Sequence, residues 1–288
     1  MGSLTVIKSG FMSTIQDRGR IGYRRIGVPV SGAMDTKSMR DANKIVGNAE
    51  STPVVEHTFY GGIYLFNTIS IISITGASCN PTINGRLVNQ YEAIKVEKGD
   101  ELEIHYPKRG CRSYLAIQGR LRIPLVMNSC STYLPGKFGG FKGRAIQKSD
   151  VIFWDDDLNQ IATQLFQKGE IPYFSTKIKV NISAGPEFDL LSEHAADRLF
   201  SISFKVHPQS NRMGIRLTGA SISIINFDMV SSPVIPGIIQ LPPSGNPIIL
   251  MNDAQTIGGY PRIGIMKESE LWRLGQLKAG DCISFKLA

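Results

Sequence analysis

The chain has 288 residues, of which 42% are hydrophobic, and 32 Lys and Arg against 24 Asp and Glu give it a formal net charge of +8 at pH 7. This length exceeds that of a usual single-core domain, so we expect two domains. The basic residues are dispersed in runs no longer than pairs such as Arg24-Arg25, with no RNA-binding or helix-turn-helix signature. The charge therefore favours anionic substrates or an acidic partner protein over nucleic acid.

The spacing of cysteines and histidines predicts neither a metal site nor a disulfide framework. Four cysteines share no C-x-x-C spacing: Cys79, Cys111, Cys130 and Cys282. Four histidines are not paired at helical or hairpin spacing: His57, His105, His194 and His207. We therefore expect no metal, and reduced thiols in the cytoplasm. Apolar runs such as Ile69 to Ile74 have the length of strands, so we expect no membrane-spanning segment.

The first predicted element with a clear boundary is a helix from Thr36 to Val46. Met39, Ala42 and Val46 fall on one helical face, and Asp35 stands where an N-cap is expected. Gly47-Asn48 then ends the helix. Because Asp35 fits the cap, we favour that structural role for it over a functional one.

A small residue followed by Asp precedes an apolar strand at three places: Gly99-Asp100, Ser149-Asp150 and Gly280-Asp281. This is turn chemistry typical of β-rich domains, and its recurrence hints at two related halves. Between the second and third copies, Ile161, Leu165 and Phe166 follow an acidic run at helical spacing, which predicts a linker helix from Asp155 to Gly169. We place the domain boundary there, giving an N-terminal β-rich domain over residues 1–170 and a C-terminal domain over residues 171–288.

The C-terminal half begins with an alternating strand over Ile178 to Ile182. A helical face follows, formed by Phe188, Leu191, Ala195 and Leu199, and a last short helix is expected near Ser269 to Leu277. The 29 glycines and 15 prolines lie among short Ile/Val/Thr-rich runs, which favours strands and turns over long helices. The fold class is therefore mainly β with a few short helices.

Polar residues suited to ligand recognition gather in glycine-rich segments of both halves. The candidate substrate-binding residues are Gln16, Arg20, Tyr23, Arg212, Arg216, Gln240, Gln255, Thr256 and Tyr260. Arginine forks suit carboxylate or phosphate oxygens, and glutamine side chains suit an amide. Candidate acids or bases are Asp17, Glu56 and Asp253. Each residue singly has the alternative of a structural hydrogen bond, whereas the set fits a cleft between domains.

Motifs of common enzyme classes are missing. The sequence contains no Walker loop, and no G-x-G-x-x-G follows a strand. The segment Gly139 to Arg144 suits either a cradle for carboxylate or phosphate or a glycine-rich hairpin. No histidine lies in a recognisable nucleophile motif, so we do not expect nucleophilic catalysis by this chain alone.

Several short motifs in fixed order carry a family resemblance. They include Ser129 to Thr132, Gly139 to Arg144, Ser210 to Gly219, Gly237 to Ile248 and Asp253 to Pro261. Together with Ala42 to Asn48 and Ile74 to Ala77, they resemble the biotin-dependent carboxyltransferase-like family. That family includes the C subunit of bacterial 5-oxoprolinase and allophanate hydrolase subunit 2.

The resemblance implies two β-barrel-like domains, the C-terminal one cyclophilin-like. It also implies a small-molecule role beside 5-oxoprolinase subunits A and B, opening 5-oxo-L-proline to L-glutamate with ATP at a site shared with the B subunit. The arginine and glutamine candidates fit such a lactam acid. Lys267 is followed by Glu268 where a biotin carrier would read A-M-K-M, so we expect no covalent biotin on this chain.

The resemblance leaves two alternatives open. One is the carboxyltransferase component of a biotin-dependent urea or allophanate system. The other is a non-catalytic regulatory module that antagonises an inhibitor of a kinase. Asn211 stands where many relatives carry Asp, which puts an acid role at that position in doubt.

Overall fold

The computed structural model describes residues 1–155, 170–224 and 229–288. The chain groups into two compact units, the first formed by Met1–Arg20 with Ser31–Phe174, the second by Ile21–Val30 with Ser175–Ala288. Residues 21–30 thus belong with the C-terminal part, which no sequence pattern indicated. The predicted linker helix falls almost wholly outside the described residues, and the boundary at residue 170 stays a prediction.

The first unit is built from antiparallel strands. One sheet has the order β11 (Arg120–Leu121), β12 (Val151–Asp155), β1 (Gly2–Ser9), β4 (Gly62–Phe66), β9 (Glu101–Ile104), β6 (Thr82–Ile83) and β7 (Arg86–Leu87). The other has the order β2 (Met12–Gln16), β3 (Val54–Thr58), β10 (Arg112–Ile117), β5 (Ser70–Gly76) and β8 (Ile94–Val96). Leu4, Tyr64 and Trp154 of the first sheet share a buried core with Ile74 and Leu115 of the second. The two sheets are therefore held together by apolar burial.

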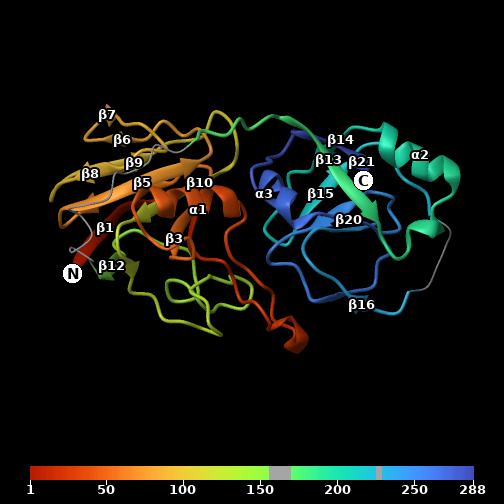
Figure 1. The fold of residues 1–288 in the computed structure, drawn as a ribbon, viewed down its shortest axis with the longest axis horizontal. Helices are drawn as coiled ribbons and strands as arrows, with labels where there is room; N and C mark the ends of the chain where they lie inside the picture. The colour runs from red at the N-terminus through yellow and green to blue at the C-terminus, as the bar shows by residue number, and fades with distance from the viewer. Residues whose placement is uncertain (156–169, 225–228) are drawn as a thin grey trace. The chain divides into compact units, whose positions relative to one another are not determined.

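Helix α1 (Thr36–Ile45) covers the outer face of the second sheet, against β5 and β10 (Figure 1). Met39 and Ala42 of the helix pack with Tyr114 of β10. The Asp35 carboxylate accepts a hydrogen bond from Ser38 N at 2.9 Å, which satisfies one of the free amides of the first turn. The predicted helix and its Asp35 cap are confirmed.

The second unit contains a closed barrel. Its strands follow the order β13 (Lys177–Ala184), β20 (Arg262–Met266), β17 (Ile238–Gln240), β18 (Ile248–Leu250), β15 (Gly214–Thr218), β14 (Phe204–Val206) and β21 (Cys282–Leu287). The pairing of β13 with β21 is parallel, and it closes the barrel. Val180, Ile182 and Phe285 alternate with less buried neighbours and are fully buried inside. The expected mainly β fold with a barrel in the C-terminal part is confirmed.

Short helices surround this barrel. They are η3 (Phe188–Leu190), α2 (Glu193–Ser201), η4 (Glu268–Glu270) and α3 (Leu271–Leu274). Helix α2 contacts β21, as Figure 1 shows, through a face that includes the buried Ala195 and Leu199. A small pair of strands, β16 (Ser232–Pro233) and β19 (Ile257–Gly258), lies outside the barrel order. The predicted helices near 188–199 and 269–277 are present but shorter, each with a 3-10 turn first.

The three predicted Asp turns have one geometry. Asp100, Asp150 and Asp281 each accept a hydrogen bond from the backbone amide three residues earlier, at 2.8 to 2.9 Å. The residue before each Asp has a positive φ, and it is Gly in two copies and Ser149 in the third. The turn thus needs a left-handed residue and a short carboxylate, which explains the shared sequence.

His57 in β3 is fully buried, with its Nδ1 2.9 Å from Ser13 Oγ and 3.3 Å from Tyr64 OH. Burial lowers the pKa of His57 from 6.5 to about 3, because the interior does not solvate an imidazolium. Below pH 6.5 the unfolded chain therefore binds a proton that the folded chain does not. The stability contributed by neutral His57 is complete above that pH and is lost as the pH falls toward 3.

We predict that His57→Gln flattens the acid dependence of stability. This group lowers the free energy of unfolding of the natural chain by up to about 1.4 kcal/mol per pH unit in that range. The variant is less stable at neutral pH, but its free energy of unfolding lacks the pH dependence that His57 causes. Urea unfolding between about pH 7 and pH 5 measures the slope. The exposed His194→Gln in α2 is the control and should keep the natural slope. Equal slopes for His57→Gln and the natural chain would contradict the prediction.

Candidate functional site

Three neighbouring barrel strands carry the candidate site. In the ladder, Ile248 of β18 lies opposite Arg216 of β15 on one side and opposite Gln240 of β17 on the other. The adjacent Ile249 and Ile215 are 2% exposed or less and point into the barrel core. Because side chains alternate along a strand, Arg216, Ile248 and Gln240 share the opposite face. The fold thus places a cation and an amide on either side of an apolar residue.

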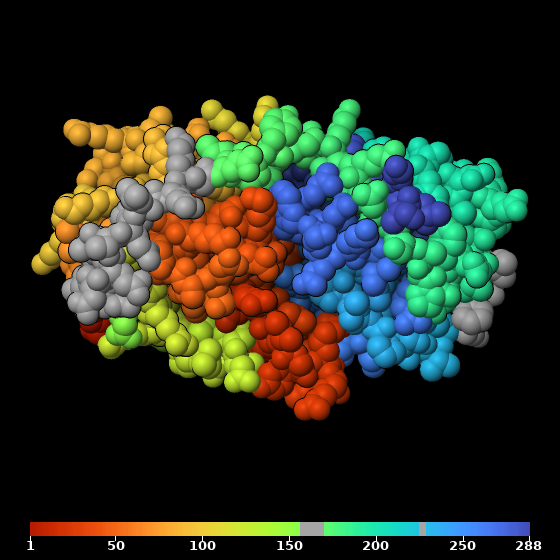
Figure 2. Space-filling view, viewed as in Figure 1, coloured from red at the N-terminus to blue at the C-terminus, as the bar shows by residue number. Residues whose placement is uncertain are grey.

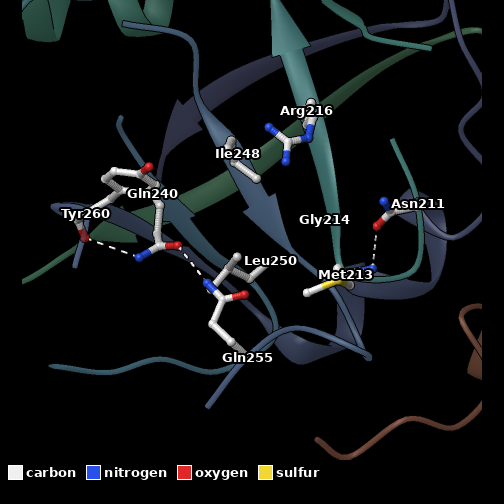
Figure 3. Close-up of a pocket in the computed structure, with 9 residues that line it drawn as sticks. All are labelled: Asn211, Met213, Gly214, Arg216, Gln240, Ile248, Leu250, Gln255 and Tyr260. Atoms are coloured by element: carbon white, nitrogen blue, oxygen red, sulfur yellow. Dashed lines mark hydrogen bonds between the residues drawn. The ribbon is translucent and has the colours of Figure 1, made fainter. Parts of the chain in front are cut away.

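A pocket of about 140 Å³ lies over this face (Figure 3). Its polar lining consists of Asn211, Arg216, Gln240, Gln255 and Tyr260. Its remaining lining consists of Met213, Gly214, Ile248 and Leu250. The volume is below the roughly 300–1,000 Å³ of pockets for drug-sized ligands, so the pocket suits a compact compound.

The amides of the pocket are hydrogen-bonded in series. Gln240 Nε2 donates to the Tyr260 carbonyl at 3.2 Å, and Gln255 Nε2 donates to Gln240 Oε1 at 3.3 Å. Gln240 is 2% exposed, whereas Gln255 is half-buried. In the view of Figure 3, these amides lie at one side of the pocket, and the Arg216 guanidinium lies at the other. Gln255 therefore presents its amide from a wall that Gln240 supports.

Arg216 supplies the charge of the pocket. Its backbone N–H and C=O are hydrogen-bonded to Ser210 Oγ, but its exposed guanidinium makes no hydrogen bond or ion pair with a described residue. No carboxylate stands among the described residues that line the pocket. The guanidinium is therefore available for a carboxylate or another anionic group of a ligand, with bidentate geometry.

Arg212 behaves differently although it is only four residues away. Its Nε donates to Asp253 Oδ2 at 2.8 Å and its Nη2 to Asp253 Oδ1 at 3.1 Å, and both side chains are about 5% exposed or less. This buried bidentate pair ties the segment before β15 to the loop after β18. Arg212 and Asp253, both predicted as site residues, thus form a salt bridge with each other.

A segment of the N-terminal sequence belongs to the same unit as the pocket. Residues 21–30 include the 3-10 turn η1 (Arg24–Ile26), and Figure 2 shows the segment at the surface, in red, beside C-terminal residues in blue. Arg24 Nη2 donates to the carbonyls of Val234 and Gln255, the latter at 3.1 Å. Partial burial lowers the pKa of this guanidinium. Arg24 therefore fixes the backbone of a pocket residue.

Two predicted binding residues lie inside the first unit. Gln16 at the end of β2 is fully buried, and its Nε2 donates to Thr14 Oγ1 at 3.0 Å and to the Thr132 carbonyl at 3.3 Å. Arg20 is also fully buried, donates to the Ser131 carbonyl and lies 4.8 Å over the Phe138 ring. Both side chains tie the N-terminal strand to the loop around residue 131.

The candidate acids Asp17 and Glu56 also have structural partners in the first unit. Asp17 accepts hydrogen bonds from Gly19 N, Ser129 Oγ, Cys130 N and Ser131 Oγ, at 2.5 to 2.8 Å. Glu56 is 1% exposed and accepts from Met34 N at 2.8 Å and Tyr114 OH at 2.9 Å. Burial, with the Glu56 charge, raises the pKa of Tyr114 well above its ordinary value. The catalytic roles of Asp17, Glu56 and Asp253 stay predictions.

The remaining predicted residues, Tyr23 and Thr256, contribute backbone carbonyls to hydrogen bonds in the second unit. The Tyr23 carbonyl accepts hydrogen bonds from Ile26 N and Val28 N, and the Thr256 carbonyl accepts one from Val234 N at 3.0 Å. Neither side chain lines the pocket. Thus the structure gathers Arg216, Gln240, Gln255 and Tyr260 in one pocket of the second unit.

The glycine-rich segment Gly139 to Arg144 packs against its own unit. A Cβ on Gly139 would lie 2.1 Å from the Ser131 carbonyl oxygen, and one on Gly143 would lie 2.1 Å from that of Lys137. Arg144 makes a bidentate pair with Asp150, both bonds 2.7 Å long. The glycines are therefore needed for close backbone packing in a series of turns, which favours a structural role over an anion cradle.

Other kinds of site receive no support within the described part of the chain. There, no group of three or more His, Cys, Asp and Glu is arranged to hold a metal ion. No helix of that part combines the length and the apolar character needed to cross a membrane.

Sequence reasoning missed Arg24 and the apolar lining. Arg24 was visible only as one of several arginines in a glycine-rich segment, and its partners lie more than two hundred residues away. Ile248 and Leu250 were visible as alternate residues of a strand. The signal that could have found Ile248 and Leu250 is the alternation of inward- and outward-facing residues along β15, β17 and β18. The order of these strands in the barrel, however, cannot be read from the sequence.

We predict a large loss of stability on substitution of Arg212 and almost none on substitution of Arg216. Arg212→Ala leaves Asp253 buried without its cation, so the free energy of unfolding should fall by about 3–5 kcal/mol. Arg216→Ala removes an exposed guanidinium that has no partner among the described residues, and the change should stay within about 0.5 kcal/mol. Chemical unfolding of both variants makes the comparison. A similar loss in both would show that Arg216 is structural.

We also predict that Arg24, but not Arg25, orders the pocket wall. Arg24→Ala removes the donor to two carbonyls and should cost about 1–3 kcal/mol, with faster amide hydrogen exchange around residues 234 and 255. Arg25 is exposed beside it, so Arg25→Ala is the matched control and should exchange like the natural chain. Unchanged exchange in Arg24→Ala would refute the role.

Comparison with known proteins gives one family. The sequence pattern described as carboxyltransferase domain, subdomain A and B, matches residues 26–287. The C subunit of the Escherichia coli 5-oxoprolinase is 33% identical over 98% of this chain and 90% of its own length.

Urea amidolyases are similar over only part of their length. The urea amidolyase of Saccharomyces cerevisiae is 33% identical over 98% of this chain, but this covers 16% of the relative. The crystal structure of the Kluyveromyces lactis urea amidolyase superposes with a TM-score of 0.91 and 32% identity, over 98% of this chain and 18% of that one. The chain therefore belongs to the carboxyltransferase domain family, subdomains A and B.

Proposed function

We propose that the chain is the C subunit of an ATP-dependent 5-oxoprolinase, which opens 5-oxo-L-proline to L-glutamate together with subunits A and B. The observation that carries this proposal is the share of each relative's length that the chain covers. The chain spans 90% of the C subunit of the E. coli 5-oxoprolinase, whereas it spans 16% of the yeast urea amidolyase at the same identity. The chain thus matches nearly the whole of a separate C subunit but a small part of a urea amidolyase.

The pocket chemistry supports the same ligand. 5-Oxoproline has one carboxylate and one lactam group on a five-membered ring. Arg216 offers a guanidinium to the carboxylate, and the glutamines offer amides to the lactam. Ile248 and Leu250 offer apolar surface to the ring methylenes. The pocket has a partner for each part of this compound.

Catalysis requires more than this pocket. Among the described residues that line it, none is Asp, Glu, His, Cys, Ser or Lys. Ring opening needs a group that activates water and a proton donor for the lactam nitrogen. In our proposal, this chain binds and orients the substrate, the partner subunits supply those groups, and activity belongs only to the assembled complex.

ATP enters the proposal at a site completed by the B subunit. The segment Gly139 to Arg144, whose composition suits phosphate, has its glycines packed against backbone and its arginine paired with Asp150. The residues present therefore do not form a phosphate cradle there. Covalent biotin is not part of the proposal, because Glu268 follows Lys267.

A second candidate is the carboxyltransferase component of a urea or allophanate system. The superposition on the K. lactis urea amidolyase, with a TM-score of 0.91, favours it. Urea itself is neutral, so it would leave Arg216 without an anion unless a carboxylated compound occupied the pocket. A regulatory binding module is a third reading, for which the pocket has no required role.

The test combines the purified chain with subunits A and B, ATP and 5-oxo-L-proline. We predict glutamate release that needs all three subunits. Arg216→Ala should lower kcat/KM by about 10- to 150-fold, the value of a hydrogen bond to a charged group. The control Arg25→Ala should stay within about twofold. Release without this chain would favour the regulatory module, and biotin-dependent carboxylation of urea in place of release would overturn the proposal.

A further inference from the structure

The two pocket glutamines form a chain of hydrogen bonds whose direction is fixed at one end. A backbone carbonyl only accepts, so Gln240 must turn its Nε2 to the Tyr260 carbonyl, 3.2 Å away. The Oε1 of Gln240 then faces Gln255. Because this oxygen can only accept, its partner at 3.3 Å must be the Nε2 of Gln255. One backbone carbonyl thus assigns both amide orientations, which heavy-atom positions alone do not settle.

The consequence is that Gln255 presents its oxygen to the ligand. No described residue donates to Gln255 Oε1, and Figure 3 draws this oxygen on the side of the amide away from Gln240. Gln255 lines the pocket and is half-buried. Water reaches this oxygen in the free chain, and a ligand that fills the pocket displaces that water. A ligand that brings an N–H replaces the lost hydrogen bond, so it is favoured over one that does not.

A neighbouring glycine shows that the two glutamine side chains are closely packed. A Cβ on Gly258 in β19 would lie 2.6 Å from Gln240 Nε2 and 3.4 Å from Gln255 Nε2. The next residue differs, because the nearest atom to a Cβ on Gly259 is Ser231 Oγ at 3.6 Å. The hydrogen-bonded pair therefore has space only because residue 258 lacks a side chain.

We infer that Gln255 Oε1 is a specificity determinant that selects ligands by an N–H group, with Arg216 binding their anionic end. This inference rests on the proposed function and deepens it, since it assigns the lactam N–H of 5-oxoproline to Gln255. An analogue with a ring oxygen in place of that N–H, a lactone acid, brings an acceptor to face an acceptor. The pocket rejects it although its shape and charge are the same.

The experiment compares the binding of the lactam acid and the lactone acid by calorimetry, with the full chain alone and in complex with subunits A and B. The natural protein should bind the lactam acid at least about 10-fold more tightly. In Gln255→Leu, the two affinities should differ by about twofold or less, mainly through loss of lactam affinity.

Gly258→Ala tests the same point without changing a lining side chain. The added methyl displaces Gln240 Nε2 and with it the support of Gln255, so the preference for the lactam should fall at least about threefold. Gly259→Ala is the matched control and should keep the natural ratio, because its methyl is accommodated.

The outcomes separate this inference from the proposed function. Glutamate release by the complex without preference for the lactam, or a preference that survives in Gln255→Leu, overturns the role of Gln255 alone. Preference for the N–H compound without glutamate release overturns the proposed function and supports the role of Gln255. Binding of neither compound overturns both.

Discussion

The register of three barrel strands is the constraint on which the candidate site depends. Because Ile248 pairs with Arg216 on one side and with Gln240 on the other, a cation and an amide flank one apolar side chain at ladder spacing, about 5 Å per strand. A shift of one residue in β18 would bring Ile249 to the pocket face and Ile248 to the core face. Barrel closure by β13 and β21 prevents such a shift, since each strand is held on both sides.

What the net charge indicates about ligands depends on which arginines are paired with carboxylates. Arg144, Arg212 and Arg262 each form a bidentate or multiple contact with a carboxylate, and these pairs join loops within one unit. Arg216 differs because its guanidinium has no partner among the described residues and stands in a pocket lined without carboxylates there. The formal charge of +8 therefore indicates less about ligands than this one local imbalance does.

Local features could be predicted from the sequence, whereas long-range pairings could not. The Asp35 cap and the three Asp turns depend on residues within three positions, and their chemistry is visible in the sequence. Arg212 and Arg216 have the same residue type and similar surroundings in the sequence. The difference between them is a carboxylate 41 residues away, at Asp253.

The same reason explains why the structural contacts of Gln16 and Arg20 in the first unit could not be predicted. Gln16 and Arg20 have the composition of a binding segment, but their partners are carbonyls of a loop more than a hundred residues away. Arg24, a few residues later, belongs to the second unit and binds the pocket wall there. A strand order and a loop path decide these contacts, and neither follows from residue type.

The most direct measurement is a crystal structure of the chain, in complex with subunits A and B, with 5-oxo-L-proline bound. The account predicts the carboxylate within about 3 Å of the Arg216 guanidinium and the lactam nitrogen within about 3 Å of Gln255 Oε1. Substrate bound away from both side chains, or bound with its carbonyl oxygen turned to Gln255 Oε1, would contradict it.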